Sequence, residues 1–549
     1  MSRVAVLAAL LVLVAPGQAA AARFGVGVLP GWSAQRLAAR LEVATGRRPA
    51  TLIPGSALVV EARSRAALAR VPGVAYVAPL DAKRRPAFTT NDPLAPLQWY
   101  LAADKAFDFW PTFPQLATVK VAVVDSGIDA GHPEFAGRIA DGRSFVGGSW
   151  RVDTNGHGMF TAGEIAAAVD NGVGVAGIAF SAQLLIAKVV DANGDLPLQA
   201  EVAGIRWAAD AGAQVINLSL GGVRDPLDPK LDTYSPLEQA AVDYAVRKGA
   251  VVVAAVGNGP QSPATPWPYA LYPAALPHVI GVSAVTQTGD VPDFSNRDVV
   301  YDDLAAPGVG IVSTVPRDMT AENPTCTDQG YSPCGTDEFA HAIGTSFSAP
   351  QVSAAAALVL AARPGLRPEQ VVTLLERNAD DASPATGCGR CPAGRDALSG
   401  WGTLDVERAV QAATSGPLPP TDAYETNDEA GPWAFPLWGP KGRTIRATLD
   451  FWDDQLDVYS IVLRKGQRLY ARLAAGQGDV ALELWKPGTN TIEGIDVQLA
   501  QRAAVGKPVG RQERIAYTAR AGGTYYLAAR LQAPTPLPDA YTLAFSKAG

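Results

Sequence analysis

The sequence predicts an α/β protein whose main domain is a doubly wound parallel sheet. Between residues 91 and 415, apolar runs typical of buried strands alternate with helical patterns, as expected for a parallel sheet covered by helices on both faces. The 549 residues are enough for further domains, and 48% hydrophobic with 18% charged residues is ample for packed cores. We expect a small α+β unit before this domain and a β-sandwich after it.

The first 22 residues have the composition of a secretory signal peptide. One Arg precedes a short apolar stretch that ends in small residues, MSRVAVLAALLVLVAPGQAAAA. A membrane anchor is the alternative, but the apolar stretch is shorter than the ~20 residues needed to span a bilayer. We therefore predict residues 1–22 as a signal peptide, and a secreted protein with no membrane attachment after its cleavage.

Residues 23–90 form the first predicted domain. It begins with a strand, FGVGVL, and a helix capped by Ser33. Two strands, PATLIP and ALVVEA, come next, followed by a short helix, RSRAALARVPG, and a last strand, VAYVAPL. This βαββαβ order predicts a ferredoxin-like fold. The unit carries 11 basic and 3 acidic residues, against 34 and 50 in residues 91–549, so the two can attract each other. Its arginines lack interleaved aromatics, so we predict no nucleic-acid binding.

Six strand-like runs define the predicted domain at residues 91–415, namely VKVAVV, LLIAKVV, VINLSL, VVVAAV, VIGVSAV and LAAPGVGI. Helical patterns cover residues 199–211 and 236–248, and Gly249 follows the second as a C-terminal cap. A further helix within residues 341–362, HAIGTSFSAPQVSAAAALVLAA, is apolar on all sides and is therefore expected to be buried.

Three side chains in this domain suit nucleophilic catalysis. Ser346 lies in the first turn of the buried helix, where unpaired N–H groups and the dipole favour the negative charge of a tetrahedral intermediate. A serine needs a base, and His157 begins a second small-residue helix; His341, five residues before Ser346, is the alternative. Asp125 ends a buried strand, where parallel sheets place their sites, and can therefore orient His157.

The chain after residue 415 changes character. GPLPP, residues 416–420, reads as a proline-stiffened linker. In residues 421–549, strand-like segments are separated by Gly, Pro and polar turns: DVYSIVL, QRLYARLAA, VALELWKP, RIAYTARA, TYYLAAR and YTLAFS. Short strands at this spacing predict a β-sandwich.

Four cysteines in an exported chain predict two disulfides. Proximity favours Cys326–Cys334 and Cys388–Cys391 among the three possible pairings. The second pair forms a Cys-x-x-Cys motif, which could instead be redox-active or bind zinc, but no second pair or histidine stands at metal-binding spacing.

Five motifs in one order carry a family resemblance: VVDSGID, NGHG, VVVAAVGN, LAAPG and GTSFSAP. With the order Asp125, His157, Ser346, the chain resembles the subtilisin-like serine peptidases, the subtilases. The resemblance implies a serine endopeptidase that hydrolyses peptide bonds through this triad and an acyl-enzyme intermediate. It also implies polypeptide substrates and no cofactor in the chemistry, and we expect a monomer.

The resemblance also assigns positions around the triad. Asn258 matches the family's oxyanion donor, although it could simply form a turn before Gly259. The two walls of the substrate pocket match Ser219, Leu220, Gly221 and Gly222, and Ala254, Ala255, Val256 and Gly257, although a Gly-Gly pair after a strand is also ordinary turn chemistry.

Two flanking segments resemble family appendages. Residues 23–90 resemble the inhibitory propeptide, which implies maturation by cleavage between about Arg85 and Pro93, either by the protein itself or by another protease at Lys83-Arg84-Arg85. Residues 421–549 resemble the pre-peptidase C-terminal domain of secreted bacterial proteases.

A structural calcium ion is a further expectation from the resemblance. Glu134 and a loop with Val169, Asn171, Val173 and Val175 match the family's strong calcium site, although the loop is one residue longer here. Carboxylate, amide and backbone oxygens are the ligands that Ca²⁺ prefers. The alternative is a glycine-rich loop with no metal.

Two other functions compete with a peptidase. An esterase usually carries Gly-x-Ser-x-Gly and the order Ser, Asp, His, which this chain lacks. A catalytically silent pseudoprotease that acts as a secreted binding or scaffold protein is the alternative that remains. Met159 and Phe160 replace a polar pair that the family usually has beside the histidine, but His157 is retained, so we expect altered packing rather than lost chemistry.

Overall fold

The computed structural model forms two compact units, residues 1–86 and 87–549. It describes residues 22–29, 32–63, 67–68, 70–80, 88–320, 329–415, 422–425, 427–438, 442–449, 456–476, 479–489, 492, 500–508, 512–532 and 539–548. Residues 1–21 of the predicted signal peptide, the linker at 416–420 and Cys326 lie outside these residues, as do residues 64–66 and 69 of the second short helix predicted before residue 74. Ala22, the last residue of the predicted signal peptide, is the first residue of a strand.

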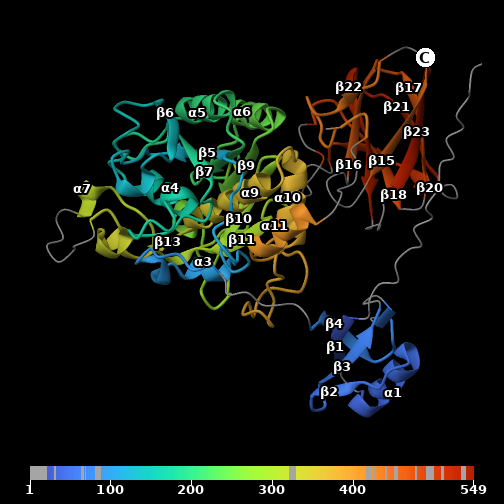
Figure 1. Ribbon diagram of the computed structural model, residues 1–549. Helices are drawn as coiled ribbons and strands as arrows, with labels where there is room; N and C mark the ends of the chain where they lie inside the picture. Colours follow the sequence, from blue (N-terminus) through green and yellow to red (C-terminus); the bar gives the residue numbers. More distant parts are fainter. Residues whose placement is uncertain are drawn as a thin grey trace, which may run out of the picture. The chain divides into compact units, whose positions relative to one another are not determined.

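The first unit is a four-stranded antiparallel sheet with one described long helix (Figure 1). Strands β1 (Ala22–Val28), β2 (Ala50–Ile53), β3 (Ala57–Ala62) and β4 (Val74–Pro79) pair in the order β2-β3-β1-β4. Helix α1 (Ala34–Thr45) begins at Ser33, whose side chain accepts a hydrogen bond from Arg36 N, and buries Leu37 and Leu41. The strand order confirms the ferredoxin-like prediction.

The second unit contains a seven-stranded sheet in the order β11-β10-β9-β8-β5-β7-β6, in which every neighbouring pair is parallel. Six strands are those the sequence predicts: β5 (Val119–Asp125), β7 (Ala182–Lys188), β8 (Val215–Leu218), β9 (Val251–Ala255), β10 (Val279–Val285) and β11 (Leu304–Pro307). The seventh, β6 (Ile139–Ser144), was not predicted. Because β5 is flanked by β7 and β8, the chain reverses direction across the sheet beside Asp125, which is where α/β sheets bind ligands.

Helices cover both faces of this sheet (Figure 1). On one face α5 (Leu198–Asp210) and α6 (Pro236–Arg247) pack in one apolar cluster, and on the other α4 (His157–Ala166), α9 (Ala349–Ala362), α10 (Pro368–Arg377) and α11 (Val406–Thr414) pack in a second. Short elements complete the unit: α3 (Trp99–Ala103), β12 (Val309–Ile311), α7 (Arg317–Thr320), α8 (Asp337–Ala340) and β13 (Ala342–Ile343). The doubly wound prediction is confirmed.

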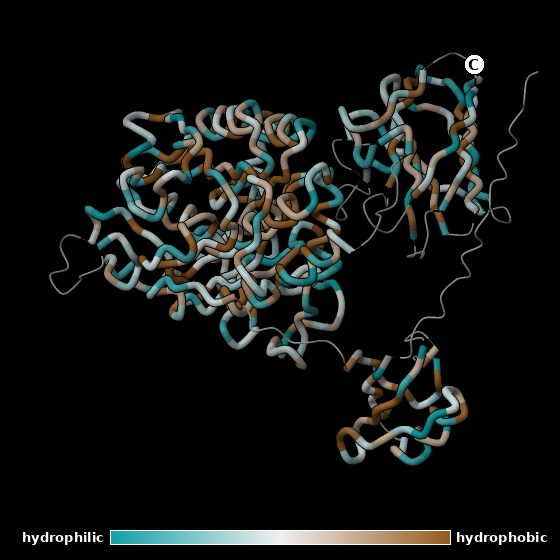
Figure 2. The backbone as a smooth tube through the Cα atoms, in the orientation of Figure 1, coloured by the Kyte–Doolittle hydropathy of each residue, from teal (hydrophilic) through white to brown (hydrophobic). Residues whose placement is uncertain are grey.

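Helix α9 is the centre of the second cluster and contacts β5, β8, β9, α4 and α11. Of the described residues, Thr345–Ala362 is the one stretch long and apolar enough to cross a membrane, yet 89% of it is buried inside this domain. It is therefore a core helix, as its uniformly apolar surface predicts. Hydrophobic segments are correspondingly concentrated inside the domain (Figure 2).

The C-terminal region is built from two five-stranded sheets, which confirms the predicted sandwich. One has the order β14-β16-β22-β18-β19 and the other β15-β23-β17-β21-β20. Inward-facing residues such as Ile445, Leu469 and Phe545 form one core between them. The strands are β14 (Phe435–Pro436), β15 (Arg443–Leu449), β16 (Leu456–Leu463), β17 (Arg468–Ala475), β18 (Val480–Trp485), β19 (Arg502–Val505), β20 (Lys507–Pro508), β21 (Gln512–Thr518), β22 (Gly523–Leu531) and β23 (Asp539–Ala548).

Two buried carboxyl groups make the α5–α6 contact sensitive to pH. Glu201 and Glu238 are each 4% exposed. Burial and the neighbouring Glu238 raise the pKa of Glu201, so the folded protein holds a proton there that the unfolded chain releases above about pH 4.5. Stability is therefore full at acidic pH and is lost as the pH rises through the raised pKa.

We expect Glu201→Gln, which mimics the protonated acid, to stabilise the protein at pH 9 by on the order of 1–3 kcal/mol and to change little at pH 5. Thermal melting of both proteins at the two pH values measures this. An equal shift in melting temperature at both pH values would contradict the conclusion that folding holds a proton at Glu201.

Candidate active site

The predicted site residues meet at the carboxyl ends of the central strands. Asp125 is the last residue of β5, Ser219 follows β8 and Asn258 follows β9. His157 is the first residue of α4, and Ser346 lies in a short 3-10 turn (Thr345–Phe347) that precedes α9. Parallel strands end at one edge of a sheet, so side chains far apart in the sequence share one site.

Asp125 and His157 are hydrogen-bonded. His157 Nδ1 lies 2.9 Å from both Oδ1 and Oδ2 of Asp125, and Oδ1 also accepts from Ser126 N at 2.7 Å. The helix can approach because Gly158 has no side chain, since a Cβ there would lie 2.6 Å from Gly127 O. Gly158 N donates to Ser126 Oγ at 2.8 Å, which fixes the start of α4 on the end of β5.

Asp153 holds the turn before His157. Its Oδ1 accepts from Gly156 N at 2.9 Å, and its Oδ2 accepts from Met159 N at 2.9 Å, so it satisfies the open end of α4. Burial alone would lower the pKa of His157, but the Asp125 carboxylate outweighs it and raises that pKa above its ordinary value. The imidazole is thus poised to accept a proton while Asp125 stabilises the resulting cation.

The turn that carries Ser346 contacts this pair through the residue after the serine. Its Oγ donates to Ser219 O at 3.2 Å, and the ring of the next residue, Phe347, packs 5.5 Å from the His157 ring, centroid to centroid. A buried chain of hydrogen bonds fixes the backbone of Ser346: Ser353 Oγ donates to Asn217 Oδ1, Asn217 Nδ2 to Ser219 Oγ, and Ser219 Oγ to Ser346 O, at 2.9, 3.0 and 2.7 Å.

The helix that the sequence predicts around Ser346 begins later than expected. Helix α9 starts at Ala349 with Ser348 as its N-cap, and Pro350 lies in its first turn as predicted. Ser348 Oγ donates to Ala306 O at 3.0 Å, and Gly344 N donates to Gly308 O at 2.9 Å. The turn that holds Ser346 is closed by its own backbone bonds, from Phe347 N to Gly344 O at 3.1 Å and from Ser348 N to Thr345 O at 3.0 Å, so Ser346 lies in a separate 3-10 turn.

Asn258 has one side-chain atom engaged. Its Oδ1 accepts from Thr345 N at 2.9 Å and from Thr345 Oγ1 at 3.2 Å, which fixes the orientation of the amide. Within the described part of the chain, no hydrogen bond is recorded for its Nδ2. Thr345 therefore holds Asn258 beside the turn of Ser346 with its N–H₂ available to a ligand oxygen.

The two predicted pocket walls lie next to each other, because β8 and β9 pair in the sheet. Ser219–Gly222 continues from β8, and Gly221 and Gly222 are at least partly exposed. Gly222 exchanges two 2.9 Å hydrogen bonds with Tyr272, and a Cβ on Gly221 would lie 2.2 Å from Tyr272 O. Ala254–Gly257 at the end of β9 is buried and contributes mainly backbone.

Met159 and Phe160, where the sequence predicts altered packing beside His157, are fully buried. The Phe160 ring lies 4.7 Å from Phe347 and 5.8 Å from Phe339, centroid to centroid. This aromatic cluster extends from the histidine helix to the serine turn. The substitutions therefore change the packing behind the site and leave the Asp125–His157 hydrogen bond in place.

Gln351 on α9 joins the segments that carry His157 and Ser346 to β11. Its Nε2 lies 2.7 Å from Phe347 O, 2.8 Å from Pro307 O and 3.1 Å from Glu164 Oε1 on α4. An amide has only two N–H hydrogens for these three oxygens. Glu164 is fully buried, and its burial raises its pKa well above the ordinary value, which favours the protonated acid.

We expect Glu164→Gln to keep kcat/KM within about twofold of wild type, because a neutral amide replaces a neutral acid of the same shape. Glu164→Ala should destabilise the protein by about 2–4 kcal/mol through a cavity between α4 and α9. Steady-state kinetics and thermal melting of the two variants test this. If both variants lost activity equally, a negative charge at Glu164 would be required.

The loop predicted to bind calcium surrounds Glu134, which is fully buried. Glu134 Oε2 accepts from Asn171 Nδ2 at 3.0 Å, and Oε1 from Val175 N and Tyr331 Oη, both at 3.1 Å. Burial raises the pKa of Glu134 to about 7, and none of the ion pairs among the described residues involves it. Asp92 joins the same loop by accepting from the backbone of Asn171 at 3.0 Å.

The cysteines follow the predicted framework where they are described. Cys388 and Cys391 form a disulfide with an S–S distance of 1.98 Å, and both are buried. Cys334 is also disulfide-bonded, and its predicted partner Cys326 lies outside the described residues.

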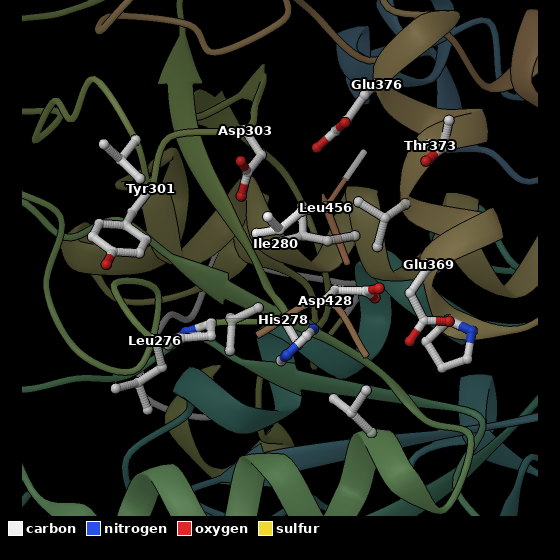
Figure 3. A pocket seen from close by; sticks show the side chains of 16 residues that line it. Leu276, His278, Ile280, Tyr301, Asp303, Glu369, Thr373, Glu376, Asp428 and Leu456 are labelled. Atoms are coloured by element: carbon white, nitrogen blue, oxygen red, sulfur yellow. The ribbon is translucent and has the colours of Figure 1, made fainter. Parts of the chain in front are cut away.

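A cavity of about 230 Å³ lies at the other edge of the sheet, near the amino end of β10 (Figure 3). Carboxyl groups of Asp303, Glu369, Glu376 and Asp428 and the imidazole of His278 line it. Burial and the neighbouring Glu425 raise the pKa of Asp428 well above its ordinary value. The cavity lies away from the strand ends that carry Asp125, Ser219 and Asn258.

Comparisons with known proteins match the domain that contains this site. A model described as the subtilase family matches residues 117–402, a range that includes Asp125, His157, Asn258 and Ser346. Thermitase of Thermoactinomyces vulgaris is 34% identical over 301 residues, which are 54% of this chain and 93% of thermitase. Subtilisin E of Bacillus subtilis (strain 168) is 37% identical over 265 residues, 48% of this chain and 61% of that protein. A thermophilic serine proteinase of Bacillus sp. (strain AK1) is 33% identical over 299 residues, and the match covers 65% of its length.

Proposed function

The chain belongs to the subtilase family of serine peptidases, and from that premise we propose that it is a secreted endopeptidase acting through Asp125, His157 and Ser346. The observation that carries the proposal is the 2.9 Å contact between His157 Nδ1 and the Asp125 carboxylate, with Ser346 in the adjoining turn. The deciding experiment is labelling of the protein with a fluorophosphonate, followed by peptide mass mapping: attachment at Ser346 is expected.

In the proposed reaction, the Ser346 hydroxyl leaves Ser219 O and donates to His157 Nε2. As Oγ attacks the peptide carbonyl carbon, its proton passes to His157, and Asp125 stabilises the imidazolium. The same proton then goes to the leaving amine as the C–N bond breaks, which leaves an acyl-enzyme. Water, deprotonated by His157, attacks the ester, and Ser346 recovers its proton when the carboxylic acid departs.

The tetrahedral intermediate carries a negative oxygen, for which we propose Asn258 Nδ2 and the Ser346 backbone N–H as donors. Support comes from the two hydrogen bonds with Thr345, which orient the amide before substrate arrives. A preoriented donor costs no reorganisation at the moment of reaction. Substrate backbone is proposed to lie along Ser219–Gly222 as an added strand.

We propose that residues 23–90 are an inhibitory propeptide that is removed on maturation. Its residues up to 86 belong to a compact unit of their own, with a core around Val26, Leu37 and Leu41, whereas Phe88 packs on Phe107 and Phe113 of the second unit. Its net positive charge complements the acidic remainder of the chain. Cleavage between about Arg85 and Pro93 would separate the two units.

We also propose a structural calcium ion at the Glu134 loop. The chemistry of the donor set suits such an ion: Glu134 is a buried carboxylate without a cationic side chain paired to it in the described part of the chain. Asn171 stands beside it, with Nδ2 donating to Glu134 at 3.0 Å and Oδ1 accepting from Val173 N at 2.8 Å, so an ion would have to replace these two hydrogen bonds. The ion would be held by Glu134, the Asn171 amide oxygen and backbone carbonyls of the 169–175 loop. It would supply the positive charge that this buried acid lacks and would rigidify the loop.

Removal of calcium is therefore expected to lower the melting temperature. An ion present at 100 times its dissociation constant contributes about 2.7 kcal/mol. Differential scanning calorimetry with calcium, with chelator, and with Glu134→Gln measures the effect, and the variant should no longer respond to calcium. If chelator leaves the melting temperature of the wild type unchanged, the proposal of a structural calcium ion is wrong.

A further inference from the structure

The outer face of one sheet of the C-terminal sandwich carries a row of cations. Across neighbouring strands, Thr444 of β15 pairs with Ala544 of β23, Ala544 with Arg472 of β17, Arg472 with Arg514 of β21, and Arg514 with Lys507 of β20. Strands lie about 4.8 Å apart, so three positive side chains stand next to one another within roughly 10 Å. Like charges directly opposite each other destabilise a sheet.

No acidic side chain in the described part of the sandwich neutralises this row. Among the described residues, no ion pair involves Arg472, Arg514 or Lys507, and the side-chain hydrogen bond recorded for Arg514 is a 3.3 Å contact to Gln512. The nearest acid on β21, Glu513, points to the opposite face by strand alternation. The other sheet differs, because its Arg502 donates to Glu483 at 2.7 Å.

The cationic row borders a groove. A hollow of about 850 Å³ is lined by Arg443, Arg472, Lys507, Arg514 and Tyr470, whose side chain is 40% exposed. Small side chains at Ala516, Ala544 and Ser546 form its floor, so a ligand can come close to the sheet. Residues 421–549 as a whole contain 15 basic and 14 acidic residues, so the positive charge here reflects segregation and not a basic composition.

We propose that this groove, with its cationic row of Arg472, Arg514 and Lys507, binds acidic polypeptide segments. Guanidinium groups pair with carboxylates through two parallel hydrogen bonds, and the bound carboxylates remove the repulsion within the row. The choice of a polypeptide, and its role in holding substrate near the peptidase domain, rests on the proposed function. Binding itself does not depend on catalysis.

The test uses full-length protein with Ser346→Ala, so that the probe is not digested. Poly-L-glutamate is titrated into this protein and into the same protein carrying Arg472→Glu/Arg514→Glu or the milder Arg472→Gln/Arg514→Gln. Arg464→Glu/Lys465→Glu, in the exposed turn between β16 and β17, is the matched control with the same change in charge. Circular dichroism checks that each variant is folded.

We expect binding that weakens with salt between about 0.05 and 0.5 M, and a loss of roughly tenfold or more in the Arg472/Arg514 reversal but not in the control. The neutral pair should fall between them. Equal binding by the reversal and the control would show that the groove is not the binding site. Tighter binding of dextran sulfate than of poly-L-glutamate would contradict the proposal that the partner is a polypeptide. Failure of the peptidase proposal would leave these binding results unchanged.

Discussion

Replacing Ser346 by alanine is expected to lower turnover of a peptide substrate by about 10⁶-fold, the size of the loss in subtilisin, a relative from which this magnitude is carried over. The fold should survive. The lost side-chain contact is a single 3.2 Å hydrogen bond to Ser219 O, and the bond from Ser219 Oγ to the Ser346 carbonyl remains. The loss therefore reports chemistry and not unfolding.

Wild type and Ser346→Ala are compared by secretion, intact mass and N-terminal sequencing, together with peptide hydrolysis and melting temperature. If the protein matures itself, wild type begins near residue 91 and the variant retains residues from about 23. Processing of both proteins alike would assign maturation to another protease. Hydrolysis by the variant near the wild-type rate would show that Ser346 is not the nucleophile.

The sequence predicts the fold best where burial is complete. The six predicted strands of the main sheet are mainly apolar runs, and residues such as Val121 and Val253 are fully buried. Strand β6 gave no such signal, because it lies at the sheet edge and its sequence, IADGRS, is largely half-exposed or exposed. An edge strand owes its place to pairing with β7, which a local pattern does not encode.

In the candidate site too, the sequence predicts some residues and misses others. Asp125, His157, Asn258 and Ser346 stand in recognisable motifs, and the structure places them at one edge of the sheet. Glu164, Gln351 and Ser353 were not predicted, although a polar side chain within an otherwise apolar helix is a signal for each. Their partners come from other elements, so only the tertiary structure identifies what they hold.

Asn258 offers the second large effect. We expect Asn258→Ala to lower kcat by about 10²–10³-fold with little change in KM, because the amide would act on the oxyanion and not on the ground-state carbonyl; this range is also known from the matching donor in subtilisin. Alanine also removes the acceptor for Thr345 N, so part of its effect could come from a displaced Ser346 turn. Alanine alone thus does not separate the two roles.

Asn258→Asp separates them. A carboxylate can still accept from Thr345 N and Thr345 Oγ1, which keeps the turn in place, but it puts a negative oxygen where the N–H₂ donor stood. We therefore expect near-normal thermal stability and a loss in kcat at least as large as that of Asn258→Ala. Stopped-flow acylation rates and melting temperatures for the two variants decide the matter. If Asn258→Asp retained the wild-type acylation rate, Asn258 would serve only to hold Thr345, and the oxyanion would depend on backbone donors.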